Sequence, residues 1–376
     1  MKSIGIITIH KINNYGSVLQ AYALQKVCEE LGYDVEVIDY DFPNDFHRQH
    51  VLKLNDEDSS PTQNEPKWIK ALFGLALMRQ HKGIRRFVKH YLHLSNKNYT
   101  SPEQLSANPP IYDIYITGSD QLWSPRHCQG DPTFMLHFAP DEALKISYAA
   151  SIGSDNIPNQ LITKYKELLG RYAAISVRET SGAEIIERII GSRASIVLDP
   201  TLLLNRNQWN KIAKGNRIFK DKYILCYFLN YSFNAFPYVD ELAEHIRRQT
   251  GFKIVRVARP PHTLNWRDNK YKIGASPEEF LSLVRDAEIV LTTSFHGTAF
   301  AVNYGRPVLT IVKSKDSSDS RQVSLMNNLC LNRQIVELES DFPDYNMAKY
   351  DTYEEQEKLE KLRKESLEYL IHSLKL

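Results

Sequence analysis

Short runs of apolar residues alternate along this chain with longer segments in which apolar residues recur every three or four positions. The run Lys2–Ile9 is typical of a buried strand. Residues 18–31 then carry apolar side chains at helical spacing and are followed by Gly32, a typical helix C-cap. A second apolar run, Val35–Tyr40, comes next. A strand, a helix and a strand in this order predict a βαβ unit with parallel strands.

The same alternation continues to the end of the chain and predicts an α/β protein with two tandem, doubly wound, Rossmann-like domains. We expect domains at 1–205 and 206–350, followed by a C-terminal helix at 351–376. In such folds, ligands bind at the carboxyl ends of the strands, here in the cleft between the two domains. Further strands are expected at Ile111–Thr117, Lys145–Ala150, Ala174–Val177, Ser195–Leu198, Tyr223–Phe228, Lys253–Val257 and Glu288–Thr292, and further helices at Glu179–Ile190, Tyr238–Thr250, Glu278–Asp286 and Tyr353–Leu374.

The segment from residue 289 to 310 carries the most chemical information. It predicts a buried strand, a polar turn, a helix of small residues and another strand. The turn places Ser294 and His296 at a helix start, where free N–H groups and the helix dipole favour an anion. Gly297 allows a ligand to approach the backbone, and Thr298 follows it. A histidine beside a bound anion is a suitable proton donor.

Two polar turns follow strands of the first domain. The turn after the first strand contains Asn14, Tyr15 and Gly16, which suit either a ligand-binding loop or simply a well-capped turn. The segment GSDQLW follows the strand at 111–117. We expect its polar residues to face the cleft, with Asp120 accepting a proton from a substrate hydroxyl or, alternatively, capping a helix. The residues expected to bind the substrate that carries this hydroxyl, the acceptor, are Asn14, Tyr15, Gly16, Ser119, Gln121 and Trp123. Trp123 offers a flat surface that suits a sugar ring.

Two further motifs lie at strand ends of the first domain. Arg178, in the sequence SVRE, can hold a carboxylate or phosphate with both arms of its guanidinium, or it can form a surface ion pair with Glu179. The motif LDPT, residues 198–201, reads as a structural hinge that closes the domain.

Composition narrows the classes of function. The chain has 376 residues, 42% of them hydrophobic and 24% charged, which is typical of a soluble globular protein. A net charge of +2 argues against nucleic acid as a partner. The four cysteines lie far apart, which indicates reduced thiols in a cytoplasm rather than a disulfide framework or a zinc site. We expect no signal peptide, membrane span or bound metal, and the sequence lacks G-x-G-x-x-G, Walker A, H-E-x-x-H and G-x-S-x-G motifs.

Taken together, the motifs resemble those of the polysaccharide pyruvyl transferase family. In chain order they are NNYGSVLQAYALQK, GSDQLW, YAASIG, SVRE, LDPT and TTSFHGTAFAVNYGRPV. The resemblance implies a two-domain fold like that of GT-B glycosyltransferases. It also implies transfer of pyruvate from phosphoenolpyruvate to two hydroxyls of a sugar, as a ketal, during synthesis of a capsule or exopolysaccharide. The acceptor would be the polysaccharide or its precursor, for which the resemblance allows an undecaprenyl-linked oligosaccharide.

The resemblance also assigns roles to residues. Arg178 matches the arginine of the family's S-x-R-[DE] motif, and His296 matches a histidine of its second domain, both of which imply binding of the donor. Many members have an arginine ahead of that histidine and its glycine, in an R-L-H-G pattern, whereas this chain has Phe295 ahead of His296 and no arginine at these four positions. We therefore expect either that Lys313, Lys315 or Arg321 supplies a cation in its place, or that the donor differs from that of the family.

The expected mechanism uses phosphoenolpyruvate as co-substrate and no cofactor. His296 protonates the methylene carbon of the enol, and a sugar hydroxyl deprotonated by Asp120 attacks the adjoining carbon. The second hydroxyl then displaces phosphate, whose charge is stabilised by Arg178 and the helix start. The alternatives are a GT-B glycosyltransferase that uses a nucleotide-sugar and a glycan-binding relative without catalysis. The first is disfavoured because no carboxylate for a ribose lies between Phe295 and Arg306.

The segment 66–98 combines apolar residues with eight cations and no carboxylate. It predicts a helical insertion in the first domain, made of two helices with a break near residues 81–83. One face would be apolar and the other basic, which suits peripheral contact with an anionic membrane at the inner face of the cell membrane. The alternatives are an ordinary amphipathic pair packed on the domain and a positive field that steers anionic substrates. The cations are Lys67, Lys70, Arg79, Lys82, Arg85, Arg86, Lys89 and Lys97.

Overall fold

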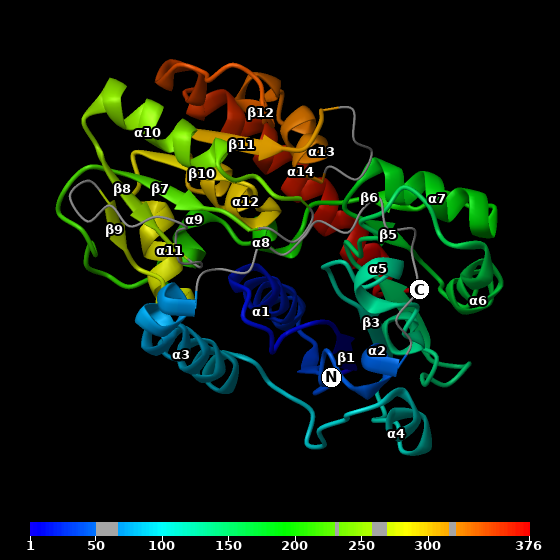
Figure 1. The fold of residues 1–376 in the computed structure, drawn as a ribbon. Coiled ribbons are helices and arrows are strands. Elements are labelled where there is room, and N and C mark those ends of the chain that lie inside the picture. Colours follow the sequence, from blue (N-terminus) through cyan, green and yellow to red (C-terminus); the bar gives the residue numbers. More distant parts are fainter. Residues whose placement is uncertain (50–66, 230–232, 258–268, 316–320) are drawn as a thin grey trace. The chain divides into compact units, whose positions relative to one another are not determined.

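The fold is that of a computed structural model, which describes residues 1–49, 67–229, 233–257, 269–315 and 321–376, without the side chains of residues 67–70 and 72. Their contacts separate into two units (Figure 1). The first unit contains residues 1–49, 88–204 and 361–376, and the second contains residues 67–87 and the described part of 205–360.

The first unit is built on a parallel sheet with the strand order β2-β1-β3-β4. Single backbone bridges from Ile146 to Ala174 and from Ala150 to Val177 continue this sheet to the parallel pair β5-β6. The strands are β1 (Ser3–Ile7), β2 (Asp34–Val37), β3 (Ile114–Thr117), β4 (Leu144–Ser147), β5 (Ser176–Val177) and β6 (Ser195–Ile196). The expected doubly wound parallel order is confirmed, because the chain runs from β1 to β2 on one side and through β3 to β6 on the other.

The longest helix within this unit, α1 (Tyr15–Glu30), is buried along most of its length. Asn14 caps its start by accepting a hydrogen bond from the Gly16 amide at 2.9 Å, and Gly32 follows its end with a φ of 90°. The other helices are α2 (Asp45–Gln49), α4 (Pro102–Ala107), α5 (Pro125–Cys128), α6 (Asn159–Leu169), α7 (Thr180–Ile190) and α8 (Pro200–Leu203), and a 3₁₀ turn, η2, spans Pro132–Met135.

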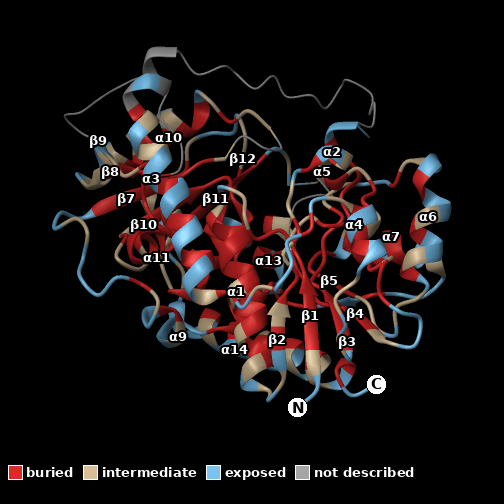
Figure 2. Cartoon of the chain, turned by 90° about the horizontal axis from the view of Figure 1, so that it is seen from below, coloured by how far each residue is buried: buried red, intermediate tan, exposed pale blue. Residues whose placement is uncertain are grey.

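The second unit has a six-stranded parallel sheet with the order β12-β11-β10-β7-β8-β9. Its strands are β7 (Tyr223–Tyr227), β8 (Lys253–Arg256), β9 (Asn269–Tyr271), β10 (Ile289–Thr292), β11 (Val308–Val312) and β12 (Ile335–Glu337). The central strands β7, β10 and β11 are buried throughout, as Figure 2 shows. Burial on both faces explains why these segments read as continuous apolar runs.

The helices of the second unit are α9 (Arg206–Asn210), α10 (Tyr238–Thr250), α11 (Pro277–Arg285), α12 (Phe295–Asn303) and α13 (Arg321–Asn328), with 3₁₀ turns η3 (Asn332–Gln334) and η4 (Tyr345–Ala348). The start of α11 has a complete capping box. The Ser276 side chain accepts from the Glu279 amide at 3.3 Å, and the Glu279 carboxylate accepts from the Ser276 amide at 2.9 Å.

Two long helices depart from the predicted domains. α3 (Lys67–Tyr91) is one continuous helix rather than two, and its residues 67–87 belong to the second unit. The predicted insertion of 66–98 into the first domain is therefore wrong for these residues. α14 (Thr352–Ser373) begins in the second unit, but from residue 361 it belongs to the first. There Ser366 accepts from the Leu198 amide at 2.9 Å.

The helix break expected at Gly83 is absent because packing requires a glycine there. A Cβ on Gly83 would lie 3.0 Å from Ser276 Cβ, so α3 approaches residues 274–276 closely. Gly274 plays the same role from the other side, since a Cβ there would lie 2.7 Å from the Ala76 carbonyl oxygen. Phe73 and Ile273 complete this contact as a small apolar cluster.

This packing predicts opposite effects for two glycines. We expect Gly274→Ala to lower the free energy of unfolding of the protein by about 1–3 kcal/mol, because α3 must shift away. Gly74→Ala is the matched control on α3 itself. A Cβ at Gly74 has no neighbour within 4 Å, so we expect helix propensity to raise stability by about 1 kcal/mol. Urea unfolding of both variants measures the two changes, and equal changes would contradict close packing at Gly274.

Candidate functional site

The polar turns of the first unit meet at the carboxyl ends of β1 and β3, where the strand order reverses. Ligands of doubly wound folds bind at this point. Thr8, just after β1, donates through Oγ1 to the Ser119 carbonyl after β3 at 2.9 Å. Gln20 of α1 donates through Nε2 to Thr8 Oγ1 at 2.8 Å. These buried bonds fix the two turns side by side.

Asp120 is the most exposed carboxylate of this cluster, with 14% of its side chain accessible. Its Oδ2 accepts from the Ser17 hydroxyl at 2.5 Å, and its Oδ1 accepts from the Gln121 amide at 2.9 Å. The backbone of Asp120 has a φ of 88°, which is strained for a residue with a side chain. Such strain costs about 1–3 kcal/mol and gathers at functional sites. The Ser151 amide, which donates to the Asp120 carbonyl at 3.0 Å, helps to hold this conformation.

Arg178 lies behind Asp120 and is closed off from solvent, with 1% of its side chain exposed. Its Nη1 donates to Asp199 Oδ2 at 2.9 Å, and its Nη2 lies 3.5 Å from Asp120 Oδ1. Ser119 Oγ donates to the same Asp199 oxygen at 2.8 Å. The alternative of a surface ion pair with Glu179 is wrong, because both side chains are buried. Arg178 forms a buried ion pair that supports Asp120 from within the unit.

Asp199 and Glu179 tie the remaining motifs of the first unit to this cluster. Asp199 Oδ1 accepts from the Thr201 amide at 3.0 Å, so LDPT supplies the partner of Arg178 rather than only a hinge. Glu179 Oε1 accepts from the Ile152 amide at 2.9 Å and from the Gly153 amide at 3.4 Å. Five motifs that are far apart in the sequence therefore converge at one edge of the sheet.

The charge of this cluster suits hydroxyl groups rather than an anion. Three carboxylates, those of Asp120, Glu179 and Asp199, lie within 4.0 Å of one guanidinium. Carboxylate oxygens accept hydrogen bonds, and sugar hydroxyls donate them. Nearby, burial raises the pKa of Tyr148 well above its ordinary value, and the charge of Asp199 raises it further. Tyr148 therefore stays protonated, and Asp120 is the carboxylate of the cluster with the most exposed side chain.

In the second unit the strand order reverses between β7 and β10, and the polar turn after β10 lies there. Thr292 donates through Oγ1 to the Tyr227 carbonyl at 2.7 Å. Thr293 Oγ1 donates to the Leu229 carbonyl at 2.9 Å and accepts from the Leu229 amide at 2.7 Å. The expectation that this turn follows a strand end and starts a helix is confirmed.

His296 is the second residue of α12 and is 5% exposed. Ser294 caps this helix, because its Oγ accepts from the Gly297 amide at 3.3 Å. Thr298 is fully buried, and its hydroxyl donates a hydrogen bond to Thr310 Oγ1 at 2.8 Å. This hydroxyl therefore links α12 to β11. Gly297 also serves packing, since a Cβ there would overlap the Thr292 hydroxyl and the Tyr227 ring. Close approach of a ligand is not what requires this glycine.

Comparison with known proteins decides the family. The model of the family described as polysaccharide pyruvyl transferase matches residues 14–314. The chain belongs to the polysaccharide pyruvyl transferase family. No curated protein matches the chain.

Solved structures show the fold that this family member adopts. The S. aureus MnaA–UDP co-structure is 11% identical, with a TM-score of 0.51, and the match covers 96% of this chain and 90% of that one. Arabidopsis thaliana UGT89C1 is 12% identical, with a TM-score of 0.49, and the match covers 97% of this chain and 94% of that one. The fold consists of two Rossmann-like α/β units of the GT-B kind.

The cations expected to replace the missing family arginine lie in the second unit. Lys313 is exposed directly after β11. Arg321 is the first residue of α13, whose second residue, Gln322, donates through Nε2 to the Thr293 carbonyl at 2.9 Å. The start of α13 thus packs against the turn that leads to His296. Phe295, which stands beside the histidine, is 6% exposed and packs edge-on against the His296 ring.

Two predicted acceptor residues of this family member are core residues instead. Trp123 has no exposed surface, and its Nε1 donates to the Phe134 carbonyl at 2.9 Å, so it offers no face to a sugar. Tyr15, the first residue of α1, is also fully buried. Asn14 is occupied in capping that helix, and Gln121 stays partly exposed beside Asp120. The flat side chain of Trp123 is needed inside the unit, where its indole N–H finds a carbonyl partner.

The structure adds Ser17 and Gln322 to the candidate site, which the sequence did not single out. Ser17 lies within the motif NNYGS and is the third residue of α1, where it is buried. Gln322 follows residues 316–320, which lie outside the described part. Among the described residues, no group of three or more His, Cys, Asp and Glu side chains is placed to hold a metal ion. In that same part of the chain, no helix is long and apolar enough to cross a membrane.

Proposed function

We propose that this protein transfers the pyruvyl group of phosphoenolpyruvate to two hydroxyls of a sugar, as a ketal, and releases phosphate. The sugar belongs to a cell-surface polysaccharide, capsule or exopolysaccharide, or to its lipid-linked precursor. Membership of the polysaccharide pyruvyl transferase family supports the reaction class. The proposal rests on one observation: the partly exposed carboxylate of Asp120 lies where the five motifs converge, on a backbone with a φ of 88°.

The carboxylate cluster of the first unit supports binding of the acceptor. Asp120 accepts a proton from the first sugar hydroxyl, whose oxygen then forms a bond to the central carbon of phosphoenolpyruvate. Ser17 fixes one oxygen of Asp120 at 2.5 Å and leaves the other near the Gln121 amide. Arg178 compensates part of the negative charge of the cluster from the buried side, through its ion pairs with Asp199 and Asp120.

The polar turn of the second unit supports binding of the donor. His296 donates a proton to the methylene carbon of phosphoenolpyruvate, which becomes the methyl group of the product. The second sugar hydroxyl displaces the phosphate, and its proton leaves with the phosphate group. Lys313 and Arg321 supply cations for the carboxylate and phosphate of the donor, with the start of α12 adding its dipole. One molecule each of phosphoenolpyruvate and diol give one ketal and one phosphate.

Asp120→Asn tests the acceptor base. Asparagine keeps the shape and the hydrogen bond to the Gln121 amide but accepts no proton. We expect kcat to fall by about 10²-fold or more at saturating acceptor, with the fold intact. The matched control is Asp141→Asn, because the Asp141 side chain is 85% exposed and pairs with Arg171. An unchanged kcat in Asp120→Asn would exclude the base role.

Calorimetry with three ligand classes separates this function from its alternatives. Binding of phosphoenolpyruvate is expected for a pyruvyl transferase. Binding of a nucleotide-sugar without phosphoenolpyruvate would indicate a glycosyltransferase instead. Binding of neutral glycans alone would indicate a glycan-binding protein without catalysis.

A further inference from the structure

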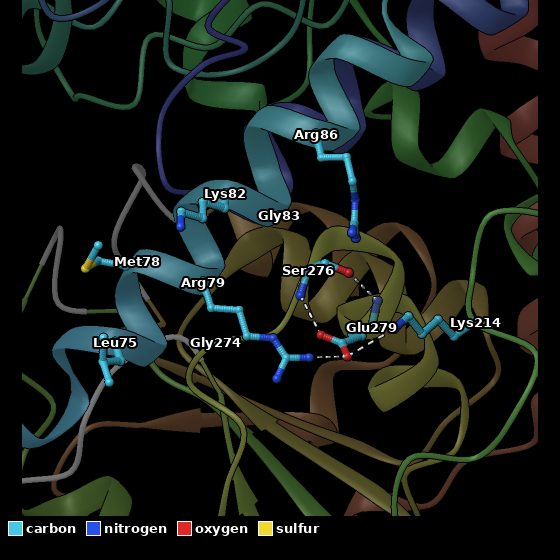
Figure 3. Close-up of a pocket in the computed structure, with 10 residues that line it drawn as sticks. All are labelled: Leu75, Met78, Arg79, Lys82, Gly83, Arg86, Lys214, Gly274, Ser276 and Glu279. Atoms are coloured by element: carbon cyan, nitrogen blue, oxygen red, sulfur yellow. Dashed lines mark hydrogen bonds and ion pairs between the residues drawn. The ribbon is translucent and has the colours of Figure 1, made fainter.

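The second unit contains a pocket of about 470 Å³ beside α3 that the proposed reaction does not use (Figure 3). One wall is α3, which contributes Arg79, Lys82 and Arg86. The other wall holds Lys214 and the capping-box residue Glu279. Figure 3 shows Arg79 and Lys214 reaching the Glu279 carboxylate from opposite sides.

Cations outnumber carboxylates in this pocket. Glu279 Oε1 lies 3.1 Å from Arg79 Nη2 and 3.3 Å from Lys214 Nζ, and only 6% of its side chain is exposed. Lys272 Nζ lies 3.2 Å from the same oxygen. Burial tends to raise the pKa of Glu279, but the Ser276 amide and the lysines outweigh burial and hold that pKa below its ordinary value. The single buried negative charge of Glu279 is therefore surrounded by three cations, those of Arg79, Lys214 and Lys272.

The remaining cations are free to meet an external anion. Lys82 forms no ion pair with a described residue, and Arg86 has only a 4.0 Å contact with Glu278. Arg86 is 68% exposed and Arg79 is 62% exposed, so both heads reach the surface. No carboxylate occurs on α3 at all. The field of this surface therefore attracts anions.

Apolar side chains lie next to these cations on the same helix. Leu75 is 81% exposed and Met78 is 56% exposed, and both line the same pocket. They precede Arg79 and Lys82 by one turn, so an apolar rim adjoins the basic pocket. A ligand that satisfies both parts carries a phosphate group beside an apolar chain.

We propose that this pocket binds the phosphate headgroups of an anionic membrane, with Leu75 and Met78 entering the acyl layer. Charge complementarity identifies the occupant, because the cations meet phosphate and the two apolar side chains meet lipid. The helix lies on the membrane surface and does not cross it. This contact goes beyond pyruvyl transfer, since it needs neither donor nor acceptor sugar.

Co-sedimentation with vesicles tests the proposal on the full-length protein. We expect binding to phosphatidylglycerol vesicles at low salt, loss of binding as salt rises, and no binding to phosphatidylcholine vesicles. Lys82→Glu/Arg86→Glu is expected to weaken the partition coefficient by about 30-fold or more. Leu75→Ser/Met78→Ser is expected to weaken it by about tenfold or more. Thermal unfolding midpoints of both variants confirm that they are folded.

Matched controls separate the pocket from general surface charge. Lys361→Glu/Lys364→Glu makes the same change in charge on exposed positions of α14, and Ile111→Ser removes an apolar side chain that is 86% exposed. Both are expected to bind vesicles like the wild type. Inorganic phosphate at constant ionic strength is expected to displace the protein no better than chloride. Absence of vesicle binding at low salt, equal loss in the controls, or binding of phosphate without vesicles would overturn the proposal.

Discussion

Arg178→Ala is expected to lower the free energy of unfolding by about 3–5 kcal/mol, because it leaves the buried Asp199 carboxylate without its cation. The Arg178 side chain is 1% exposed and that of Asp199 is 0% exposed, so water cannot replace the lost partner. Arg178→Lys is expected to recover only part of the loss, because an ammonium lacks the planar fork that reaches Asp199 and Asp120 together. Urea unfolding at neutral pH measures the free energy of unfolding of the wild type and of both variants.

Two further variants make this result specific. Arg188→Ala on α7 removes an arginine whose Nη2 forms an exposed contact with the Asp155 carbonyl at 3.4 Å. We expect this variant to change the free energy of unfolding by no more than about 0.5 kcal/mol. Arg178→Ala/Asp199→Asn also removes the uncompensated charge, and we expect it to be more stable than Arg178→Ala alone. If Arg178→Ala destabilises the protein no more than Arg188→Ala does, the buried pair is not what organises the cluster.

His296→Ala is expected to lower kcat by about 10²-fold or more, because it removes the proton donor to the methylene carbon. The fold is expected to survive, since Ser294 caps α12 through the Gly297 amide and does not depend on the ring. His245→Ala on α10 is the control in the same unit, because its ring hydrogen-bonds to the exposed Gln249 side chain and packs against the Phe342 ring. Turnover by His296→Ala close to that of the wild type would remove the histidine from the mechanism.

The two sheets could be predicted because central strands such as β3, β7, β10 and β11 are buried on both faces and are separated by helices or turns with clear ends. The strand at residues 223–227 and the capping box at Ser276 are examples in which local sequence and structure agree. The sequence does not identify the short strands β9 and β12, because three residues are too few to show the periodicity of a strand. The break expected in α3 is absent for another reason. Gly83 is required by close packing against Ser276, which lies about 190 positions away in the sequence.

The candidate site was only partly predictable. Asp120 was found because a polar residue directly after a buried strand lies at the ligand-binding edge of a parallel sheet. The partners of Arg178 were not, because Asp199 approaches it only after the motifs converge. The prediction for Trp123 is wrong because the sequence alone does not show which face of a turn is exposed to solvent. In each failure the deciding contact is long-range, whereas the pattern that was interpreted is local.

Pyruvyl transfer is tested most directly by following phosphate release from phosphoenolpyruvate in the presence and absence of sugar acceptors. Polysaccharide fragments and lipid-linked oligosaccharides serve as acceptors, and mass spectrometry follows the product. We expect phosphate release that depends on an acceptor, with an equal amount of glycan gaining the mass of pyruvate less one water. We also expect that Asp120→Asn loses this activity while Asp141→Asn keeps it. Consumption of a nucleotide-sugar by the same protein, with phosphoenolpyruvate left intact under every acceptor, would contradict pyruvyl transfer.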